Sequence, residues 1–325
     1  MKAAVIEKYG APDVVKISEV ERPVPKENEI LIKVNSATIN RTDCGFRQPS
    51  PFFLRFFTGL FRPRIKILGT EFAGEVVETG GNIKEFKSGD KVFGLSCSGF
   101  GAHAEYLSIP EDGAVALMPV NMNFNEAAAV CDGLMLAYNY LRIPDYSKGI
   151  KILIYGATGS IGSAGVQLAK YFGADITAVC NTKNLDLIKS LGADRVLDYT
   201  KSDFKLHAGQ YDVVFDAVGK LSFTKCKHLI KRGGIFFTTD LGEHNQVPFQ
   251  VLWTSFFGDK KVLFPLPKES KKDILFFKKI IEEGNYKAVI DRIYPLEKIA
   301  EAYEYVDTEQ KTGNVVLSIA GEIRA

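Results

Sequence analysis

The sequence predicts an α/β protein of two domains, in which a compact β-barrel or sandwich precedes a doubly wound parallel sheet. Residues 1–120 consist largely of short β-like runs separated by proline, glycine and aspartate. From Lys151 onwards, near-continuous apolar runs alternate with helical stretches, which is typical of a parallel sheet covered on both faces. A chain of 325 residues is long enough for about two domains.

The first predicted domain, residues 1–123, contains the β-like runs VVKISEV, EILIKVNSAT, EFAGEVVETG, DKVFGL and AEYLSI. At Asn125 the pattern changes to helical spacing in NEAAAVCDGLMLAYNYL, so residues 124–268 form the second predicted domain. Residues 269–325 hold two amphipathic helices, KKDILFFKKIIEEG and IAEAYEYV, and a closing strand, GNVVLSI. We expect this last segment to return to the first domain.

Composition and charge exclude several classes of function. The content of 46% hydrophobic and 25% charged residues is ordinary for a globular protein, and a net charge of +2 argues against a dedicated nucleic-acid binder. No apolar run approaches the roughly 20 residues of a membrane span, and the N-terminus lacks the apolar core of a signal peptide. The five cysteines are widely spaced without a C-x-x-C pair, which indicates a reducing compartment. We therefore expect a cytoplasmic protein without a nucleic-acid partner or stable membrane insertion.

A glycine-rich loop lies between the apolar strand KILIYG and the helical stretch SAGVQLAK. It fits the pattern A-x-G-x-x-G, in which Ala157 forms the tight turn, Gly159 admits a pyrophosphate, and Gly162 lets the helix pack close to the strand. The helix amides of Ser160 and Ile161 would point at the phosphates. No Gly-Lys-Ser/Thr follows, so a Walker-type loop is excluded. A tight turn without a ligand is the alternative, which the further strand–helix alternations disfavour.

The end of the second apolar strand, DITAVC, indicates which dinucleotide binds. In NAD sites an acidic residue near this point bonds the ribose 2′-hydroxyl. Here the chain continues with Asn181, Thr182 and Lys183, and Tyr199 ends the next strand. Lysine suits a 2′-phosphate, and loss of its charge-assisted hydrogen bond would cost about 1.5–3 kcal/mol. The sequence therefore predicts NADP as the cofactor, with a solvated turn lysine as the alternative.

The loop sequence GATGSIG also resembles that of short-chain reductases and sugar-nucleotide epimerases, which use a Tyr-x-x-x-Lys pair on one helical face. Tyr294 and Lys298 have this spacing. Pro295 disfavours helical geometry at Tyr294, so the two side chains would not share a helix face. The loop also lies in the middle of this chain, whereas it normally opens proteins of those families.

Segments along almost the whole chain fit a different family: MKAAVIEKYGAPDVVKI, ILGTEFAGEVVETG, FKSGDKVFG, GAHAEYLSIPED, NEAAAV, LIYGATGSIGSAGVQLAK, SLGADRVLDY, YDVVFDAVG and KTGNVVLSI. In this order they resemble the medium-chain dehydrogenase/reductase superfamily, and most closely its zinc-free quinone oxidoreductase-like branch. The resemblance implies a GroES-like catalytic domain, a Rossmann domain that binds NADP, and a cleft for nicotinamide and substrate. It also implies a homodimer that extends the Rossmann sheet through KKVLFPL.

Zinc alcohol dehydrogenases of this superfamily hold a catalytic metal with a cysteine and a histidine. The resemblance places Asn40 and Thr70 at those two positions, and Cys131 stands alone near the position of a third ligand. We therefore expect no metal. Hydrogen-bond donors must then stabilise the negative charge that grows on the substrate oxygen. Conjugation spreads that charge, so we expect a small hydrophobic quinone, enone or related carbonyl as the substrate.

The resemblance also implies the residues of the site. Asn40, Thr42 and Asp43 line the cleft, with Asn40 as a hydrogen-bond donor and Asp43 orienting its neighbours; an ordinary Asn-x-x-Asp turn is the alternative. Further family positions on the cofactor side are Gly219, Thr238, Thr239, Phe264 and Asn314.

Two departures from the family keep a second function open. The tyrosine that often follows the segment of Asn40 is absent, so the proton source is open and solvent could serve. Leu136 stands where a threonine usually lies near the nicotinamide. A protein that binds NADPH as a sensor or structural component, with little turnover, is therefore the alternative to an enzyme.

The stretch PFFLRFFTGLF is unusually aromatic and lies among basic residues. An apolar flap over a hydrophobic substrate, a helical turn packed on the barrel, and contact with a lipid surface are its three interpretations. Its phenylalanines are Phe52, Phe53, Phe56, Phe57 and Phe61.

Overall fold

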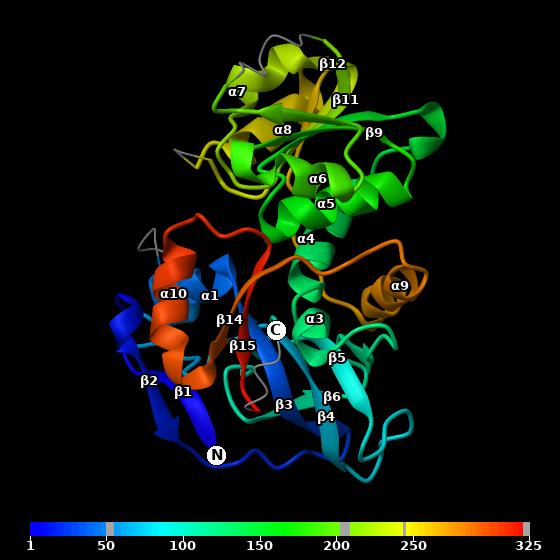
Figure 1. Cartoon of the computed structure of the whole chain (residues 1–325). Helices are drawn as coiled ribbons and strands as arrows, with labels where there is room; N and C mark the ends of the chain where they lie inside the picture. The colour runs from blue at the N-terminus through cyan, green and yellow to red at the C-terminus, as the bar shows by residue number, and fades with distance from the viewer. Residues whose placement is uncertain (50–54, 202–208, 243–244, 321–325) are drawn as a thin grey trace. The chain divides into compact units, whose positions relative to one another are not determined.

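The computed structural model describes residues 1–49, 55–201, 209–242 and 245–320. The chain forms two compact units, one of Met1–Asp132 with Glu269–Ala325 and the other of Gly133–Lys268 (Figure 1). The sequence pattern places the first boundary after residue 123. Residues 124–132 instead cluster with the first unit, because helix α3 (Phe124–Ala128) packs on four of its strands, β3, β4, β5 and β15.

The first unit is built mainly from strands. Its strands are β1 (Lys2–Ile6), β2 (Val15–Glu19), β3 (Glu29–Ile39), β4 (Glu71–Thr79), β5 (Lys91–Leu95), β6 (Tyr106–Pro110), β7 (Val115–Leu117), β14 (Ile290–Pro295) and β15 (Asn314–Ser318). Its helices are α1 (Arg41–Arg47), α2 (Arg55–Thr58), α3, α9 (Lys271–Glu282) and α10 (Ile299–Asp307), and α4 (Cys131–Leu141) begins in it. The 3₁₀ turns are η1 (Pro12–Val14) and η7 (Leu296–Lys298).

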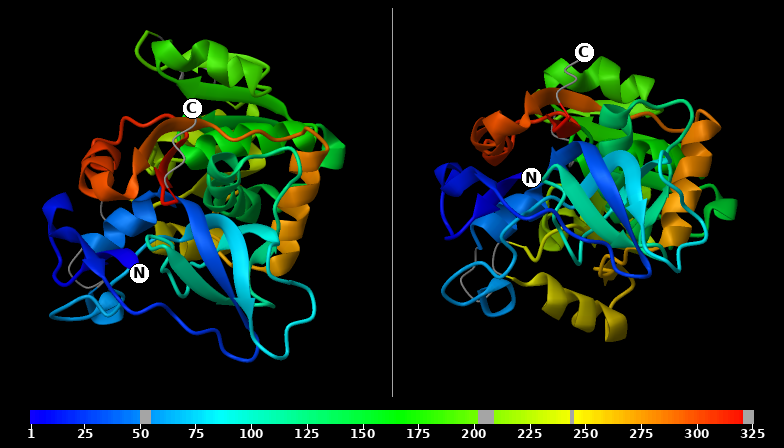
Figure 2. Two further views of the ribbon diagram at one scale, coloured as in Figure 1. Left: turned by 60° about the horizontal axis from the view of Figure 1, so that its bottom comes forward. Right: turned by 90° about the horizontal axis from the view of Figure 1, so that it is seen from below.

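Strand β3 organises this unit. It pairs antiparallel with β4, β6 and β15 within a sheet of order β14-β15-β3-β4-β5-β7, while β1 and β2 form a separate pair. The pairing of β3 with β4 shifts register after Leu31 and after Val34. Irregularities of this kind bend a strand, and a bent β3 can pair with three neighbouring strands. Ile30, Ile32 and Val34 enter one core with residues of β4, β15 and α10. The C-terminal segment therefore returns to the first unit, as Figure 2 shows in orange and red.

The second unit is a six-stranded sheet of order β10-β9-β8-β11-β12-β13, and every strand pair in it is parallel. Its strands are β8 (Lys151–Tyr155), β9 (Asp175–Cys180), β10 (Arg195–Asp198), β11 (Tyr211–Asp216), β12 (Ile230–Thr238) and β13 (Lys261–Leu263). Its helices and 3₁₀ turns are η3 (Tyr146–Lys148), α5 (Ser160–Tyr171), η4 (Thr182–Asn184), α6 (Leu185–Ser190), α7 (Phe223–Cys226), η6 (Lys227–Leu229) and α8 (Val247–Phe256). The predicted doubly wound parallel sheet is confirmed.

Both faces of this sheet are covered. On one face, the ring of Tyr140 from α4 lies 5.2 Å from that of Phe215 and 5.5 Å from that of Phe237. On the other face, Val214 and Phe236 join a core with residues of α7 and α8. The strand order reverses between β8 and β11, and ligands of open α/β sheets bind at the carboxyl ends of the strands beside such a point.

The aromatic stretch is only partly described, since Phe52, Phe53 and the side chain of Phe57 lie outside the described residues. Helix α2 is tied to the N-terminal segment because the Tyr9 hydroxyl donates to Gly59 O at 2.7 Å and bonds Thr58 Oγ1 at 2.8 Å. Phe56 is 63% and Phe61 86% exposed, so these two rings are not packed on the barrel. No helix in the part of the chain that the structure describes combines the length and apolarity of a membrane span.

Candidate active site

The glycine-rich loop joins β8 to α5, and its geometry requires glycine at two positions. Gly156 has φ 76° and takes the left-handed turn, which a side chain would disfavour. A Cβ on Gly162 would lie 2.1 Å from Gly156 O, so only glycine lets α5 approach the loop this closely. Ala157 lies in the same turn, residues 156–158, in which the sequence places it. Ala157 is fully buried, and its amide donates to Val179 O at 3.1 Å.

The start of α5 offers unsatisfied donors. Gly159 is the N-cap and supplies no side-chain hydrogen bond, so the amides of the first turn, including those of Ser160 and Ile161, lack a side-chain cap. A Cβ on Gly159 would meet no atom within 4 Å. Ser160 Oγ is buried and has no hydrogen-bond partner in the described chain. An uncapped helix start with an orphaned hydroxyl fits a phosphate, because the amides and the helix dipole both favour an anion.

The residues predicted to select NADP lie after β9 and β10. Lys183 is exposed in η4, and no described residue forms an ion pair or hydrogen bond with its ammonium. Tyr199 is also exposed, and its amide donates to Cys180 O at 3.1 Å. The structure therefore leaves a cation and an aromatic ring available at this end of the sheet.

Asn181 and Thr182 have structural partners instead. The Thr182 hydroxyl donates to Asp198 Oδ2 at 2.5 Å, and Asn181 Oδ1 accepts from Asn184 Nδ2 at 2.8 Å. The hydrogen bonds from Thr182 and Thr200 hold the pKa of Asp198 below its usual range. Asp198 thus stays ionised at neutral pH and accepts the hydrogen bond of the Thr182 hydroxyl.

Asp216 organises the ends of β11 and β12. Its buried carboxylate accepts from the amides of Leu221 at 2.7 Å and Val218 at 3.2 Å, and from the Thr238 hydroxyl at 3.5 Å. Burial raises its pKa to about 6, although the Leu221 and Val218 amides oppose that rise. Gly219 has φ 69°, and a Cβ there would lie 2.4 Å from Asp240 Cβ. The turn predicted under the cofactor therefore needs glycine for its conformation.

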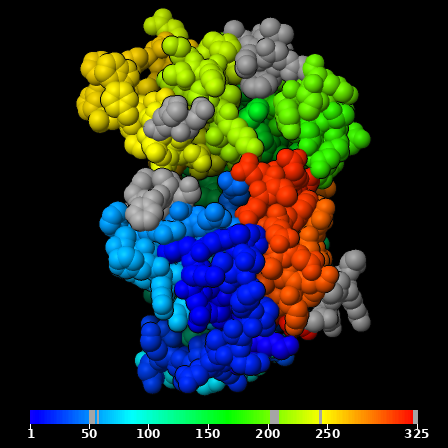
Figure 3. All heavy atoms as spheres, turned by 90° about the vertical axis from the view of Figure 1, so that its left-hand side faces the viewer, coloured from blue at the N-terminus to red at the C-terminus, as the bar shows by residue number. Residues whose placement is uncertain are grey.

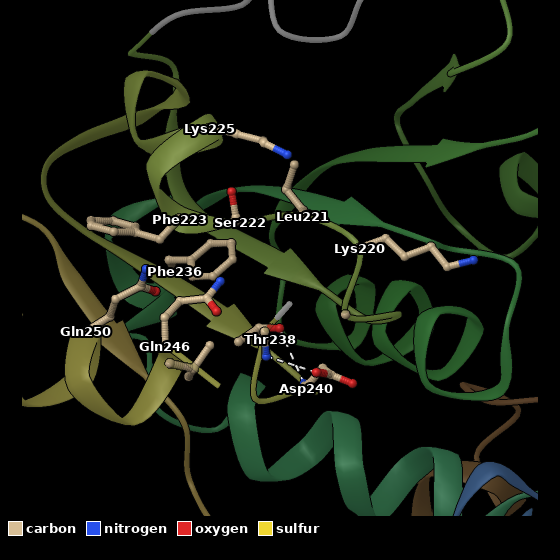
Figure 4. Close-up of a pocket in the computed structure, with 13 residues that line it drawn as sticks. Lys220, Leu221, Ser222, Phe223, Lys225, Phe236, Thr238, Asp240, Gln246 and Gln250 are labelled. Carbon is tan, nitrogen blue, oxygen red and sulfur yellow. Dashed lines mark hydrogen bonds between the residues drawn. The ribbon is translucent and has the colours of Figure 1, made fainter. Parts of the chain in front are cut away.

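A cavity of about 380 Å³ opens beside these strand ends, between α7 and α8. Gly219 and Thr238 line it, so the structure brings these two predicted cofactor residues to one hollow. The amides of Gln246 and Gln250 lie next to Phe236, and Asp240 contacts Thr238 (Figure 4). Thr239 follows Thr238, and its amide donates to Asp216 O at 3.2 Å.

In the first unit, Asn40, Asp43 and Thr70 form one hydrogen-bonded group. Asn40 caps α1, since its Oδ1 accepts from Asp43 N at 3.1 Å and Asp43 Oδ2 accepts from Asn40 N at 3.0 Å. Asn40 Nδ2 donates to Thr70 Oγ1 at 2.7 Å, and Gly69 N donates to Asp43 Oδ1 at 2.9 Å. Asn40 and Asp43 thus form an Asn-x-x-Asp turn in which Asp43 orients Asn40. The same hydrogen bonds are compatible with a role for Asn40 in lining the cleft. Thr42 is exposed.

A cluster of buried acids lies beside this group. Glu71 accepts from the Thr38 hydroxyl and, at 2.7 Å, from Asp132 N. Burial raises the pKa of Asp43 to about 7, and it raises the pKa values of Glu71 and Asp132, to which the neighbouring carboxylates add. His103 is buried with Nε2 2.8 Å from Thr38 O, and burial lowers its pKa to about 4.

These acids make the stability of the fold depend on pH. A carboxyl whose pKa is raised on folding stabilises the native state at low pH and loses that contribution as pH rises through the folded value. His103 acts oppositely, but only below its unfolded pKa of about 6.5. Three raised carboxyls outweigh one histidine, so we expect the free energy of unfolding to fall from about pH 4.5, above the unfolded carboxyl values, to about pH 8, the folded value of Glu71. Glu71→Gln should make this fall shallower by up to about 1.4 kcal/mol per pH unit, measured by urea unfolding; an equal slope in both proteins would contradict it.

The remaining predicted residues belong to both units. Phe264 follows β13 and packs on the core that α7 and α8 share with the sheet. Asn314 lies in the first unit, where its buried amide donates to Ala129 O at 2.8 Å and Val289 O at 3.2 Å. Tyr294 is in strand β14 and Lys298 in η7, so this pair does not share a helix face.

Sequence reasoning missed several residues of the site. Asp216 and Val218 flank the strand end in FDAVG, and a Cβ on Gly156 would lie 2.5 Å from Val218 Cγ1. Glu71 and Asp132 carry no motif, and they meet through the hydrogen bond from Asp132 N, at the start of α4, to Glu71 Oε1 in β4. Among the described residues, no group of three His, Cys, Asp or Glu side chains is arranged to hold a metal ion.

Comparisons with known proteins agree with this architecture. Residues 26–119 match the family described as "Alcohol dehydrogenase GroES-like domain", and residues 191–317 match "Zinc-binding dehydrogenase". The chain also resembles the quinone oxidoreductase from Coxiella burnetii, with a TM-score of 0.84 and 25% identity over 98% of this chain and 99% of that chain. The predicted GroES-like and Rossmann folds are confirmed.

Two curated relatives are more similar in sequence. The 2-methylene-furan-3-one reductase of Solanum lycopersicum is 36% identical over 98% of this chain and 79% of its own length. The "NADPH-dependent alkenal/one oxidoreductase, chloroplastic" of Arabidopsis thaliana is 34% identical over the same shares. The chain therefore belongs to the medium-chain dehydrogenase/reductase superfamily, in its quinone oxidoreductase-like branch, and is an oxidoreductase.

Proposed function

We propose that this protein is an NADPH-dependent oxidoreductase that reduces a small hydrophobic quinone, enone or related carbonyl without zinc. The observation that carries the proposal is the uncapped start of α5, with Ser160 Oγ orphaned beside it and Lys183 unpaired among the described residues. These are the donors that a diphosphate and a 2′-phosphate require. The names of the tomato and Arabidopsis relatives support a conjugated acceptor.

The hydrogen-bond donors and the cation described above have different roles in this proposal. Bound NADPH supplies a hydride to the acceptor. The first turn of α5 holds the diphosphate, and Lys183 holds the 2′-phosphate. Asn40, fixed by Asp43 and Thr70, is a hydrogen-bond donor of the catalytic unit. A conjugated acceptor reduces the demand on such donors, because it spreads the negative charge that it receives.

Zinc independence rests on the donor atoms at Asn40 and Thr70. A carboxamide donates to a hydroxyl there at 2.7 Å, and neither group matches the thiolate and imidazole that catalytic zinc sites use. Cys131 is buried, and burial and the charges of Glu71 and Asp132 raise the pKa of its thiol, which disfavours the thiolate. These donor atoms support zinc independence, although the matching family description names zinc.

The test is NADPH oxidation with a panel of quinones, enones and saturated ketones, before and after treatment with a chelator. We expect turnover with the conjugated acceptors, no effect of the chelator, and no stoichiometric zinc by elemental analysis. Tight NADPH binding without turnover on any acceptor would favour a sensor or structural role. Turnover that the chelator abolishes would refute zinc independence.

The protein also carries a surface suited to a second copy of itself. Strand β13 is the last strand of its sheet and pairs with β12 alone among the described strands. The preceding helix α8, yellow in Figure 3, carries a row of exposed apolar side chains that continues past its end. These are Phe249, Leu252, Trp253, Phe256 and Phe257, which are 53–75% exposed. An open sheet edge beside such a row fits a homodimer joined through β13. Pairing of β13 with β13 of a second copy would cover the sheet edge and the apolar row.

Trp253→Asp should convert the dimer into a monomer, because the Trp253 ring lies within 6.1 Å of Phe249 and 4.6 Å of Phe257 at the centre of this row. Sedimentation velocity measures the change. Val120→Asp is the matched control, since Val120 is 90% exposed in the other unit. A wild-type chain that sediments as a monomer would contradict the dimer.

We propose a cytoplasmic location, and the state of the cysteines is the one observation that supports it. All five are free thiols, which fits a reducing compartment. The Arabidopsis relative is described as chloroplastic. Fractionation of cells that express the protein would decide between these compartments.

A further inference from the structure

Positive charge is concentrated in residues 55–66, which we call the basic loop. This loop lies within residues 44–70, which contain five Lys and Arg residues and no Asp or Glu. The whole chain, by contrast, has 41 basic and 39 acidic residues. Arg62, Arg64 and Lys66 are exposed, and no described residue forms a hydrogen bond or ion pair with their side chains. The basic loop therefore presents positive charge that the described fold does not pair.

Apolar side chains are exposed on the same loop. Phe56 is 63%, Leu60 38% and Phe61 86% exposed. Scattered apolar residues are normal on protein surfaces, whereas a group of three within six residues indicates an interaction site. The partner of this site must therefore cover apolar side chains and also carry negative charge.

The fold anchors the basic loop on both sides of its tip. Before the tip, α2 is tied to the N-terminal segment by the hydrogen bonds described above. Gly59 then takes φ 124°, and a Cβ there would lie 2.1 Å from Arg62 O, so this turn needs glycine. After the tip, Pro63 is buried and Ile65 packs on the core of the first unit. Because the turn is already packed, little conformational freedom is lost when its exposed side chains bind a partner.

We propose that the basic loop binds the surface of a membrane that contains anionic lipids. The rings of Phe56 and Phe61 would enter the boundary between headgroups and acyl chains, and the cations would contact the anionic headgroups. A second copy of this chain fits the loop less well, because pairing of identical loops would bring like charges together. A nucleic acid fits less well because it offers no hydrocarbon to cover Leu60.

This surface would also bring the enzyme to its substrate. A hydrophobic quinone or enone partitions from water into a bilayer, so an enzyme held at the bilayer surface meets a higher concentration of acceptor. This link to the substrate rests on the proposed function, whereas lipid binding by the basic loop does not.

The first test is co-sedimentation of the full chain with vesicles of phosphatidylcholine, alone or with about 30% phosphatidylserine. We expect at least about tenfold stronger binding to the anionic vesicles, and weaker binding as salt is added. Arg62→Gln combined with Arg64→Gln should weaken this binding about 25-fold, because each cation near an anionic surface contributes a factor of about five. Lys84→Gln combined with Lys87→Gln is the matched control, since both lysines are exposed in the same unit. Equal binding by the arginine variant and the wild type would overturn the proposal.

The second test places a fluorescent ring in the basic loop. The chain has one tryptophan, Trp253, so Phe61→Trp combined with Trp253→Phe leaves a single indole, at position 61. Anionic vesicles with brominated acyl chains should quench that indole. Val120→Trp combined with Trp253→Phe is the control and should not be quenched, since Val120 is 90% exposed in the same unit. Quenching of the wild-type Trp253 without quenching at position 61 would assign lipid binding to α8 and refute the basic loop.

Phe61→Ser separates the remaining alternatives, and we expect it to weaken binding to anionic vesicles about tenfold. A raised KM for a water-soluble enone with unchanged vesicle binding would instead identify a flap over the substrate. Tighter binding of the wild type to a single-stranded oligonucleotide than to anionic vesicles would make nucleic acid the partner; either result contradicts the proposal. A wild-type chain that binds anionic vesicles but reduces no acceptor would refute the proposed function alone. Turnover without binding to anionic vesicles would refute the lipid surface alone.

Discussion

Gly159→Ala is expected to leave the fold intact and to weaken NADPH binding about 100-fold or more. A Cβ on Gly159 meets no atom within 4 Å, and φ is −69°, so the native backbone accommodates alanine. The open space lies at the start of α5, where a diphosphate must approach the backbone. Losing two charge-assisted hydrogen bonds there would cost about 3–6 kcal/mol. Fluorescence titration with NADPH and thermal unfolding measure the two effects.

Gly45→Ala is the matched control for this prediction. Gly45 lies in α1, and a Cβ there also meets no atom within 4 Å. That variant should keep both wild-type thermal stability and NADPH affinity. Unchanged NADPH affinity in Gly159→Ala would show that the loop does not approach a diphosphate. Gly162→Ala, by comparison, should lose stability as well as affinity, because its Cβ would lie 2.1 Å from Gly156 O.

Lys183→Ala is expected to weaken NADPH binding by about 10–100-fold and to leave NADH binding unchanged. The exposed ammonium has no partner among the described residues, so its removal should not disturb the fold. Its loss removes one charge-assisted hydrogen bond to the 2′-phosphate, about 1.5–3 kcal/mol. Parallel titrations with the two coenzymes measure the change. The wild-type preference for NADPH should also decrease with salt, because an exposed ion pair is screened.

Lys189→Ala serves as the control for Lys183. Lys189 is an exposed lysine of the adjoining helix α6, six positions further along the chain. Lys189→Ala should change the affinity for neither NADPH nor NADH. Equal loss of NADPH and NADH affinity in Lys183→Ala would place the lysine away from the 2′-phosphate, and Tyr199 would then be the next residue to test.

The parts of the site that could be predicted from the sequence are those that depend on neighbouring residues. The spacing of Ala157, Gly159 and Gly162 identified the loop because a strand, a tight turn and a helix follow one another directly. The same reasoning could not identify Gly156 as the residue with left-handed backbone, since a motif gives spacing and not backbone angles. Lys183 could be chosen because it follows the second strand. The engagement of the Thr182 hydroxyl by Asp198 could not be foreseen, because Asp198 lies in the next strand.

By itself the sequence determined the two domain types and the order of strands and helices in the dinucleotide unit. Those features follow from local periodicity: apolar runs of strand length, helical spacing and the glycines between them. The tertiary structure alone decided which polar groups meet. Asn40 bonds Thr70 across 30 positions, and Asp132 bonds Glu71 across 61. Burial of these groups then sets the pKa values of the acids, and burial is a property of packed elements rather than of neighbouring residues.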